Sequence, residues 1–192
     1  MSDAEKLILL MLCEIHEQLP IKNGIEAAFV KSAIYSGNTW GLKWRFSGIY
    51  NNTDDTPPEV DEVRNILDMW DFIEHSYGKL STEDKAIVLE KAPLYGGDPQ
   101  FRGFEGNSDS KQVSIASFLI DDLEHFQRFK GRDLNSHTPG SLDGFRRMLK
   151  IFFSLRPALA RRPFSATELV SILQERTRPE NRKDQDITSK SS

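Results

Sequence analysis

The chain of 192 residues is 38% hydrophobic and 28% charged, and its formal net charge is -4. This composition is typical of a soluble globular protein and excludes collagen-like repeats, a coiled-coil rod and disorder throughout. The length favours one domain, which we place over residues 1–178. A flexible tail is predicted over residues 179–192, which contain almost no apolar residues.

The first predicted helix runs from Ala4 to Leu19 and is apolar nearly all round. Residues at helical spacing form one apolar face: Leu7, Ile8, Met11, Leu12, Ile15 and Leu19. Leu9, Leu10 and Cys13 occupy much of the other face. Because an exposed face would leave a large apolar patch, this helix is either the central helix of the domain or one that packs against another subunit. Cys13, the single cysteine, is expected to be a small buried hydrophobic residue.

The apolar run LILLMLC within this helix is too short to cross a membrane. It covers residues 7–13, whereas a transmembrane helix needs about 20 apolar residues. The start MSDAEK carries little positive charge, and no small-residue cleavage site follows the apolar run. We therefore expect a cytoplasmic protein that has no membrane partner.

A second helix is expected over about residues 23–37, and an aromatic segment follows it. Residues 36–58 interrupt helical periodicity with glycines and end in a proline-containing loop. Trp40, Trp44 and Tyr50 of this segment are a candidate interaction surface. These rings could line a ligand site, but aromatic residues that alternate with small and basic ones more often fill an edge of the core or an interface.

The clearest helix runs from Pro58 to Tyr77. It has proline in its first turn, acidic residues near its positive end and a glycine after it, all of which are typical of helix boundaries. Asp68, Asp71 and Glu74 lie on adjoining turns, as they would in a metal site, but no histidine or cysteine completes a ligand set in a matching direction. We interpret them as a solvated acidic face.

Four more helices complete the predicted elements. One starts with a capping box at Ser81, another runs over residues 111–129, a third follows the loop at residues 131–140, and the last starts with a capping box at Ser165. These elements predict an all-α fold, a single compact domain of several helices joined by irregular loops.

Charge is unevenly distributed along the chain. Residues 1–126 contain 11 lysines or arginines and 22 acidic residues, whereas residues 127–162 contain 9 and 2. The basic segment either forms an anion-binding face or packs beside acidic helices of the same molecule or of a neighbouring subunit, and we favour the second interpretation. The candidate anion-binding residues are Arg128, Lys130, Arg132, Arg146, Arg147, Lys150, Arg156, Arg161 and Arg162.

Six stretches of the sequence, in this order, resemble the YfbU family of bacterial proteins. They are AEKLILLMLCEIHEQL, YSGNTWGLKW, VRNILDMWDFIEHSY, FRGFEGN, LNSHTPGSLDGFRRML and FSATELVSIL. No single stretch is diagnostic, but the six together are fairly specific and span residues 3–175. The resemblance implies a compact, mainly helical cytoplasmic protein that is able to self-associate. It also implies a family without an established biochemical activity, so no catalytic residue is carried over.

Two of these stretches contain the polar loops GFEGN and NSHTP. If the loops meet in space, Glu105, Asn107, Asn135 and His137 form one polar cluster near Arg146 or Arg147. An acid beside a histidine can act as an acid-base pair if a cleft holds it. The alternative, which we favour, is a hydrogen-bonded cluster that fixes the two loops, with His137 as a turn residue at the entrance of a helix.

Three functions from different classes fit the sequence. The leading hypothesis is a non-enzymatic interaction protein that forms homo-oligomers through its first helix and its aromatic segment. The second is a nucleic-acid or other anion binder that uses residues 128–162, which is disfavoured by the acidic balance and the absence of a zinc-finger, RNA-recognition or P-loop signature. The third is an enzyme that uses Glu105 and His137. We expect no cofactor and no metal, because the chain has one cysteine, no HExxH pair and no dinucleotide fingerprint.

Overall fold

A computed structural model describes residues 1–177 except for residues 20, 22–23, 51–55, 137–140 and 160–161. The described part is mainly helical, which confirms the predicted fold class. Its α-helices are α1 (Asp3–Glu17), α2 (Ala27–Tyr35), α3 (Trp40–Arg45), α4 (Pro58–Lys79), α5 (Thr82–Lys91), α6 (Ser110–Ser117), α7 (Ser141–Leu155) and α8 (Ala166–Gln174). Shorter elements are β1 (Phe104–Glu105), a π-helical turn (Phe118–Asp122), a 3-10 turn (Gln127–Phe129), β2 (Asn135–Ser136) and a second 3-10 turn (Arg156–Leu159). The tail predicted over residues 179–192 lies outside the described residues.

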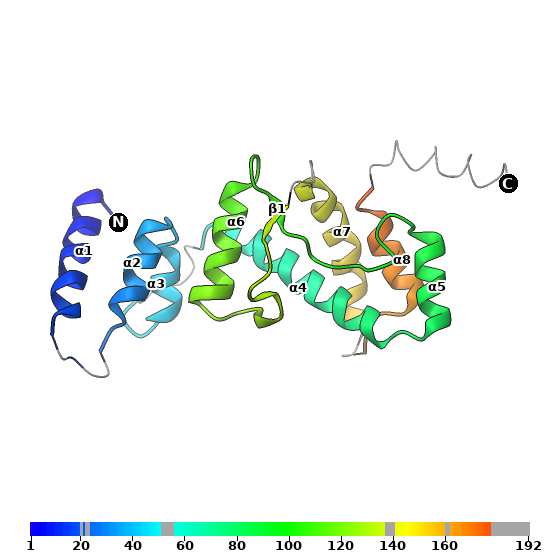
Figure 1. Ribbon diagram of the computed structural model, residues 1–192, viewed down its shortest axis with the longest axis horizontal. Coiled ribbons are helices and arrows are strands. Elements are labelled where there is room, and N and C mark those ends of the chain that lie inside the picture. Colours follow the sequence, from blue (N-terminus) through cyan, green and yellow to red (C-terminus); the bar gives the residue numbers. More distant parts are fainter. Residues whose placement is uncertain (20, 22–23, 51–55, 137–140, 160–161, 178–192) are drawn as a thin grey trace.

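The central helix of the fold is α4. Figure 1 shows α1, α2 and α3 at one end of the molecule and α5 and α8 at the other, while α4 runs between them beside α6 and α7. The buried residues of α4 are Val60, Val63, Ile66, Leu67, Met69, Trp70, Ile73 and Ser76. In contrast, α1 packs mainly on α2 and its one buried residue is Cys13. The first of the two alternatives for the first helix, a central position, is therefore wrong.

The helix predicted over residues 111–129 is shorter than its sequence pattern indicates. α6 ends at Ser117 and continues as a π-helical turn, in which the Leu123 N–H donates to the carbonyl oxygen of Phe118, five residues earlier. Glu124 and Phe126 then adopt positive φ angles of 57° and 50°, which end helical geometry. The reason is that three consecutive apolar residues at 118–120 are all buried, and one face of a regular helix cannot hold three consecutive side chains.

The aromatic segment contains a short helix, α3, which the interrupted periodicity did not predict. Gly41 allows α3 to approach the π-helical turn, because a Cβ atom added there would lie 2.3 Å from the ring of Phe118. The ring of Trp40 packs against Phe118 at a centroid distance of 5.4 Å, and its Nε1 donates to Asn38 Oδ1. α2 begins at Ala27, later than expected.

The basic segment packs beside α4 of the same chain, as the favoured interpretation predicts. Four of its arginines pair with α4 carboxylates: Arg128 with Asp71, Arg132 with Glu74, Arg146 with Glu62, and Arg156 with Asp68. The interpretation of Asp68, Asp71 and Glu74 as a solvated acidic face therefore holds only in part. Asp68 and Asp71 are 36% and 41% exposed although each pairs with an arginine, whereas Glu74 is 11% exposed. Sequence spacing placed these carboxylates on adjoining turns, but it could not show that distant arginines approach them.

Arg132 and Glu74 form the most enclosed of these pairs. Both nitrogens of the guanidinium fork donate to the carboxylate, at 2.8 and 2.9 Å, and the backbone N–H of Phe101 donates to the same carboxylate at 2.8 Å. The Glu74 side chain is 11% exposed, whereas that of Asp71, in the neighbouring pair, is 41% exposed. The Glu74 pair therefore connects α4 to two distant loops under low solvent screening.

An ion pair between Arg162 and Glu168 stabilises the start of α8. Ser165 and Glu168 form the predicted capping box, and Arg162 donates to both oxygens of Glu168 at 2.7 and 2.8 Å. The hydrogen bond from Arg162 is the main cause that lowers the pKa of Glu168 from 4.5 to about 2. Glu168 therefore stabilises the folded protein in its charged form.

We predict that Glu74→Gln destabilises the protein by about 2 kcal/mol, between the cost of breaking a buried pair and that of breaking a surface pair. The reason is that Arg132 keeps its charge but loses its charged partner. The free energy of unfolding in urea measures the effect. Asp71→Asn is the matched control and should cost less than about 1 kcal/mol, because its pair is more exposed. Equal losses in the two variants would contradict the prediction.

We also predict that the contribution of Glu168 depends on pH. The pKa of Glu168 is lowered in the folded protein from its ordinary value of 4.5 to about 2. The stabilisation is therefore fully present above about pH 4.5 and is lost as the pH falls towards 2. Glu168→Gln should therefore cost on the order of 2 kcal/mol at pH 7, after a discount for screening of the partly exposed arginine. Unfolding curves at several pH values should show the difference between the two proteins shrinking as the pH decreases below 4.5. A constant difference down to pH 2.5 would refute this role.

Candidate functional site

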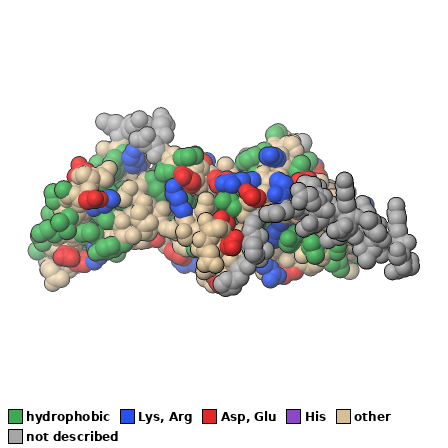
Figure 2. All heavy atoms as spheres, turned by 90° about the horizontal axis from the view of Figure 1, so that it is seen from above, with side chains coloured by type: hydrophobic (Ala, Val, Ile, Leu, Met, Phe, Trp, Pro, Cys, Tyr) green, Lys and Arg blue, Asp and Glu red, His purple; other side chains and the backbone are tan. Residues whose placement is uncertain are grey.

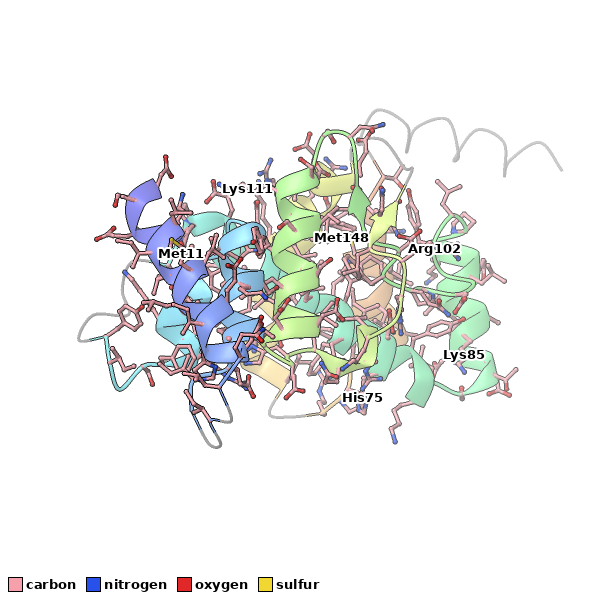
Figure 3. All side chains as sticks on the ribbon, turned by 60° about the vertical axis from the view of Figure 1, so that its left-hand side comes forward. Met11, His75, Lys85, Arg102, Lys111 and Met148 are labelled. Carbon is pink, nitrogen blue, oxygen red and sulfur yellow. The ribbon has the colours of Figure 1, made fainter. Side chains whose placement is uncertain are left out.

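The outer face of α1, together with Leu19 two residues beyond its end, exposes large apolar side chains at one end of the molecule. Figure 2 shows hydrophobic side chains gathered at this end, and Figure 3 labels Met11 on α1. The exposed fractions are 59% for Leu7, 57% for Ile8, 56% for Met11, 54% for Leu12, 57% for Ile15 and 52% for Leu19. We call these six residues the α1 face. Contiguous apolar surface of this kind is typical of an interaction site.

An apolar groove adjoins the α1 face. It has a volume of about 350 Å³ and is lined by residues from α1, α2, α3 and the segment after α3. Leu12 belongs both to the α1 face and to the groove, so the two are continuous. Ile25 and Ile49 also line the groove and are 49% and 66% exposed. Sequence reasoning did not assign these two isoleucines to a groove, because the groove forms only when α1 packs on α2 in the folded chain.

Cys13 lies at the inner side of this groove. It is 7% exposed, which confirms its predicted burial. Burial is the main cause that raises the pKa of the Cys13 thiol, and the charge of Glu17 raises it further. The thiol is therefore a packing group rather than a nucleophile.

Ion pairs lie beside the apolar groove. Lys31 of α2 donates to Glu17 at the end of α1 at 2.8 Å, and Arg45 of α3 pairs with Glu26 at 3.0 Å. These charges lie beside the apolar residues and not among them. An apolar centre with a polar rim is the usual layout of a protein–protein interface.

The aromatic segment only partly forms the predicted interaction surface. Trp40 is 7% exposed and belongs to the core, so its placement on an exposed surface is wrong. Trp44 is half-buried, and its Nε1 donates to Thr56 Oγ1. Tyr50 is 38% exposed and lines the groove. The tryptophans fill an edge of the core because each has a ring partner and a polar partner inside the molecule.

The two polar loops of the predicted cluster do meet. β1 and β2 pair in parallel, with Phe104 opposite Asn135 and Glu105 opposite Ser136. Gly103 makes this possible: its φ is +83°, and a Cβ atom there would lie 2.1 Å from the carbonyl oxygen of Leu134. Gly103, the glycine of FRGFEGN before Phe104, therefore allows the two backbones to approach closely.

Hydrogen bonds link the paired loops to the starts of α6 and α7. The backbone N–H of Glu105 donates to Ser141 Oγ at 3.2 Å, and Ser141 Oγ donates to Asp109 at 3.3 Å. Ser108 Oγ lies 2.9 Å from both Glu105 Oε2 and Asp109 Oδ1. Ser108, Asp109 and Ser141 were not predicted as members of this cluster, because small polar residues at helix starts look like ordinary caps.

The remaining predicted members of the polar cluster are Asn107, Arg146 and His137. Arg146 pairs with Glu62 on α4 and with Asp143, not with Glu105. Asn107 is exposed on the loop after β1. His137 lies outside the described residues, so the acid-base pair of Glu105 and His137 stays a prediction.

The other residues of the basic segment have varied surroundings. Arg147 donates to the carbonyl oxygens of Glu175 and Arg176, at 2.9 and 3.1 Å, and Arg162 pairs with Glu168. Among the described residues, Lys130 and Lys150 have no ion-pair partner, and Arg161 lies outside that part of the chain. The segment therefore does not form a row of unpaired cations where it is described.

Within the described ranges, no three His, Cys, Asp or Glu side chains gather in a way that could hold a metal ion. The helices of the same ranges include none with the length and hydropathy of a membrane span.

Comparisons with known proteins identify the family of the chain. The family model of the YfbU domain matches residues 1–174. The UPF0304 protein MJECS11 of Methanocaldococcus jannaschii is 30% identical over 97 residues, which are 48% of this chain and 54% of that protein. The chain thus spans about half the length of this relative, and no solved structure matches it significantly. Because the YfbU domain covers nearly all of the sequence, the chain belongs to the YfbU family.

Proposed function

We propose that this chain is a non-enzymatic cytoplasmic protein that self-associates, and that the α1 face of one copy packs against the α1 face of a second copy. One observation carries the proposal: six large apolar side chains at helical spacing are each more than half exposed. The groove beside α1 extends the contact, and the ion pairs beside the groove form its rim.

The α1 face is complementary to itself in an antiparallel arrangement. Counting residues along the helix, a pairing that places Met11 beside the partner's Leu12 also places Ile8 beside the partner's Ile15. A two-fold axis repeats both contacts, so each of these side chains meets an apolar residue. No charged side chain interrupts the α1 face, because Glu5 and Glu14 lie at its two margins on the helical wheel.

The size of the apolar face favours a stable dimer over an unpaired helix. Covering the exposed half of one such side chain contributes about 1 kcal/mol. Six residues from each of two copies therefore contribute on the order of 10 kcal/mol, from which the lost freedom of association is subtracted. A partner with charged residues at the contact would instead leave those charges without solvent.

The other two function classes have weaker support. Nucleic-acid binding through residues 128–162 would need free cations, but five arginines of this segment already pair with carboxylates. An enzyme that uses Glu105 and His137 depends on a residue whose position is not described. Neither class accounts for the exposed α1 face.

We predict that Met11→Lys converts the protein to a monomer, because a lysine near the centre of the contact cannot be covered without losing its hydration. Light scattering after size-exclusion chromatography should give twice the 21.9 kDa of one chain for the wild type and 21.9 kDa for the variant. Leu89→Lys is the matched control, since Leu89 is 49% exposed on α5, away from α1. It should remain a dimer, and a monomeric wild type at micromolar concentration would contradict the proposal.

We further predict that the dimer persists at high salt. Apolar contacts are not screened by ions, whereas phosphate contacts weaken steeply as salt increases. Sedimentation in 0.1 M and 1 M sodium chloride, about tenfold apart in ionic strength, should give the same mass or tighter association at the higher salt. Dissociation at 1 M salt, together with release of material that absorbs at 260 nm, would favour the nucleic-acid alternative instead.

A further inference from the structure

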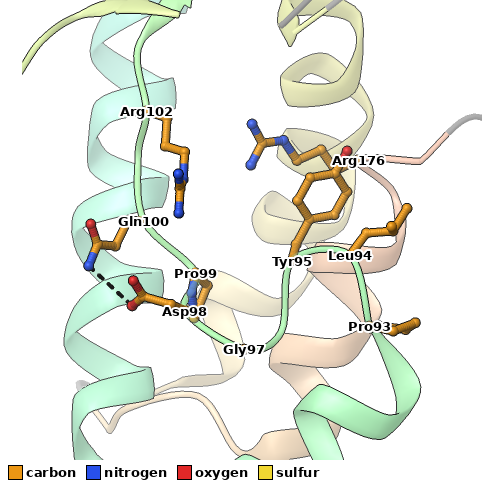
Figure 4. A pocket seen from close by; sticks show the side chains of 9 residues that line it. All are labelled: Pro93, Leu94, Tyr95, Gly97, Asp98, Pro99, Gln100, Arg102 and Arg176. Carbon is orange, nitrogen blue, oxygen red and sulfur yellow. Dashed lines mark hydrogen bonds between the residues drawn. The ribbon is translucent and has the colours of Figure 1, made fainter.

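A pocket with two arginines lies at the end of the molecule opposite α1. It has a volume of about 360 Å³, which suits a small molecule. The loop between α5 and β1 forms one side of it, and the residue Arg176, just after α8, forms the other (Figure 4). Tyr95, Asp98, Gln100 and Arg102 of the loop also line it.

Arg176 is surrounded by aromatic rings. Its guanidinium carbon lies 4.3 Å from the ring centroid of Tyr95, 5.3 Å from that of Trp70 and 5.4 Å from that of Phe145. Among the described residues, no carboxylate pairs with it. Burial is the main cause that lowers the pKa of Arg176; the Tyr95 hydroxyl opposes this effect, and the charge of Arg102 lowers the pKa further. A guanidinium keeps its proton at ordinary pH, so burial does not neutralise Arg176. The side chain remains charged and has lost part of its hydration, which costs free energy.

The backbone holds Arg176 in this position. Its carbonyl oxygen accepts a hydrogen bond from Arg147 on α7 at 3.1 Å. Gly144 leaves room for it, because a Cβ atom there would lie 3.1 Å from the same carbonyl oxygen. Two residues earlier, the side chain of Gln174 donates to the backbone of Lys91 at 2.8 Å and so ties the end of α8 to α5. The arginine is therefore preorganised and not merely a mobile side chain at the surface.

Arg102 brings a second positive charge to the same pocket. Its side chain extends from the loop into the space that Arg176 faces (Figure 4). Arg102 is exposed, and within the described chain it has no ion-pair partner. This contrasts with the arginines beside α4, each of which meets a carboxylate. Two cations in one pocket repel each other unless an anion lies between them.

The one carboxylate in the pocket does not neutralise the arginines. Asp98 Oδ1 accepts a hydrogen bond from Gln100 Nε2 at 3.1 Å, and both side chains lie at the same side of the loop in Figure 4. The loop itself is fixed, since the Tyr77 hydroxyl donates to the carbonyl oxygen of Gly97 at 2.9 Å. Asp98 is thus placed to accept a hydrogen bond from a hydroxyl group on a ligand.

We propose that this pocket binds the phosphate group of a small phosphate ester, held between Arg102 and Arg176. Each planar guanidinium can donate two parallel hydrogen bonds to phosphate oxygens, and a doubly charged group balances both arginines. Tyr95 covers one side of the Arg176 guanidinium and leaves its edge for the ligand. Asp98 and Gln100 would contact hydroxyl groups on the rest of the ester. This site is separate from the α1 face.

Calorimetric titration with inorganic phosphate, against acetate at the same ionic strength, tests the proposal. The wild type should bind phosphate and not acetate, and Arg102→Gln should weaken phosphate binding by about tenfold or more, as expected for loss of a charged hydrogen-bonding partner. Arg64→Gln is the matched control: it removes the same charge from an exposed α4 residue that pairs with Asp61. It should bind phosphate as the wild type does.

A second variant separates packing from recognition. Arg176→Lys keeps the charge but loses the planar fork, so it should also weaken binding while circular dichroism remains that of a helical protein. Absence of phosphate binding by the wild type would overturn the proposal, as would equal loss in the Arg102 and Arg64 variants. A 5′-phosphorylated oligonucleotide serves as the last probe. If it bound more tightly than inorganic phosphate and depended on Arg102, a nucleic-acid end and not a small ester would be the ligand.

Discussion

The burial of α4 is the constraint on which the rest of the structure depends. Its apolar stripe is covered by α6, α7 and α8, and Trp70 lies within it against the rings of Phe101 and Phe145. Covering a helix on several sides also brings its carboxylates close to other elements, where they lose water. The arginines of residues 127–162 compensate for that loss. Trp70 Nε1 remains a buried donor without a partner among the described atoms, which is a cost that the surrounding packing offsets.

In this arrangement α1 lies at one end of the fold and not in its centre. α4 already has its apolar neighbours and α1 packs mainly on α2, so among the described residues the second apolar face of α1 stays exposed. A face of this composition would normally be selected against in a monomer, because it promotes association of any kind. Its regular spacing and its uncharged centre instead fit one defined contact. The same reasoning explains why the tryptophans of the aromatic segment are a poor candidate surface: their partners are already inside the molecule.

The sequence predicts elements that are governed by local rules and fails where distant residues decide. α1, α4 and α8 follow from apolar periodicity, first-turn residues and capping boxes, which act within a few positions of each other. The π-helical turn at Phe118 was missed because it results from tertiary packing of consecutive apolar residues. Pairing of β1 with β2 could be anticipated as a meeting of two loops, but its register depends on Gly103, whose role appears only in three dimensions. Arg176 was not singled out, since no local pattern distinguishes an arginine near a tail from one in a pocket.

The described arginines can be divided by whether a carboxylate of the same chain pairs with them. An arginine beside a carboxylate has its charge balanced inside the chain, and this accounts for most of the basic segment. Arg102 and Arg176 lie outside that segment and line one pocket, and among the described residues neither pairs with an acid, so the anion that we propose for them comes from outside. The α1 face lies at one end of the molecule and the helices next to these arginines at the other, with α4 between them. The proposed self-association and the proposed anion binding can therefore be tested one at a time, and any coupling between them would have to pass through the packing of α4.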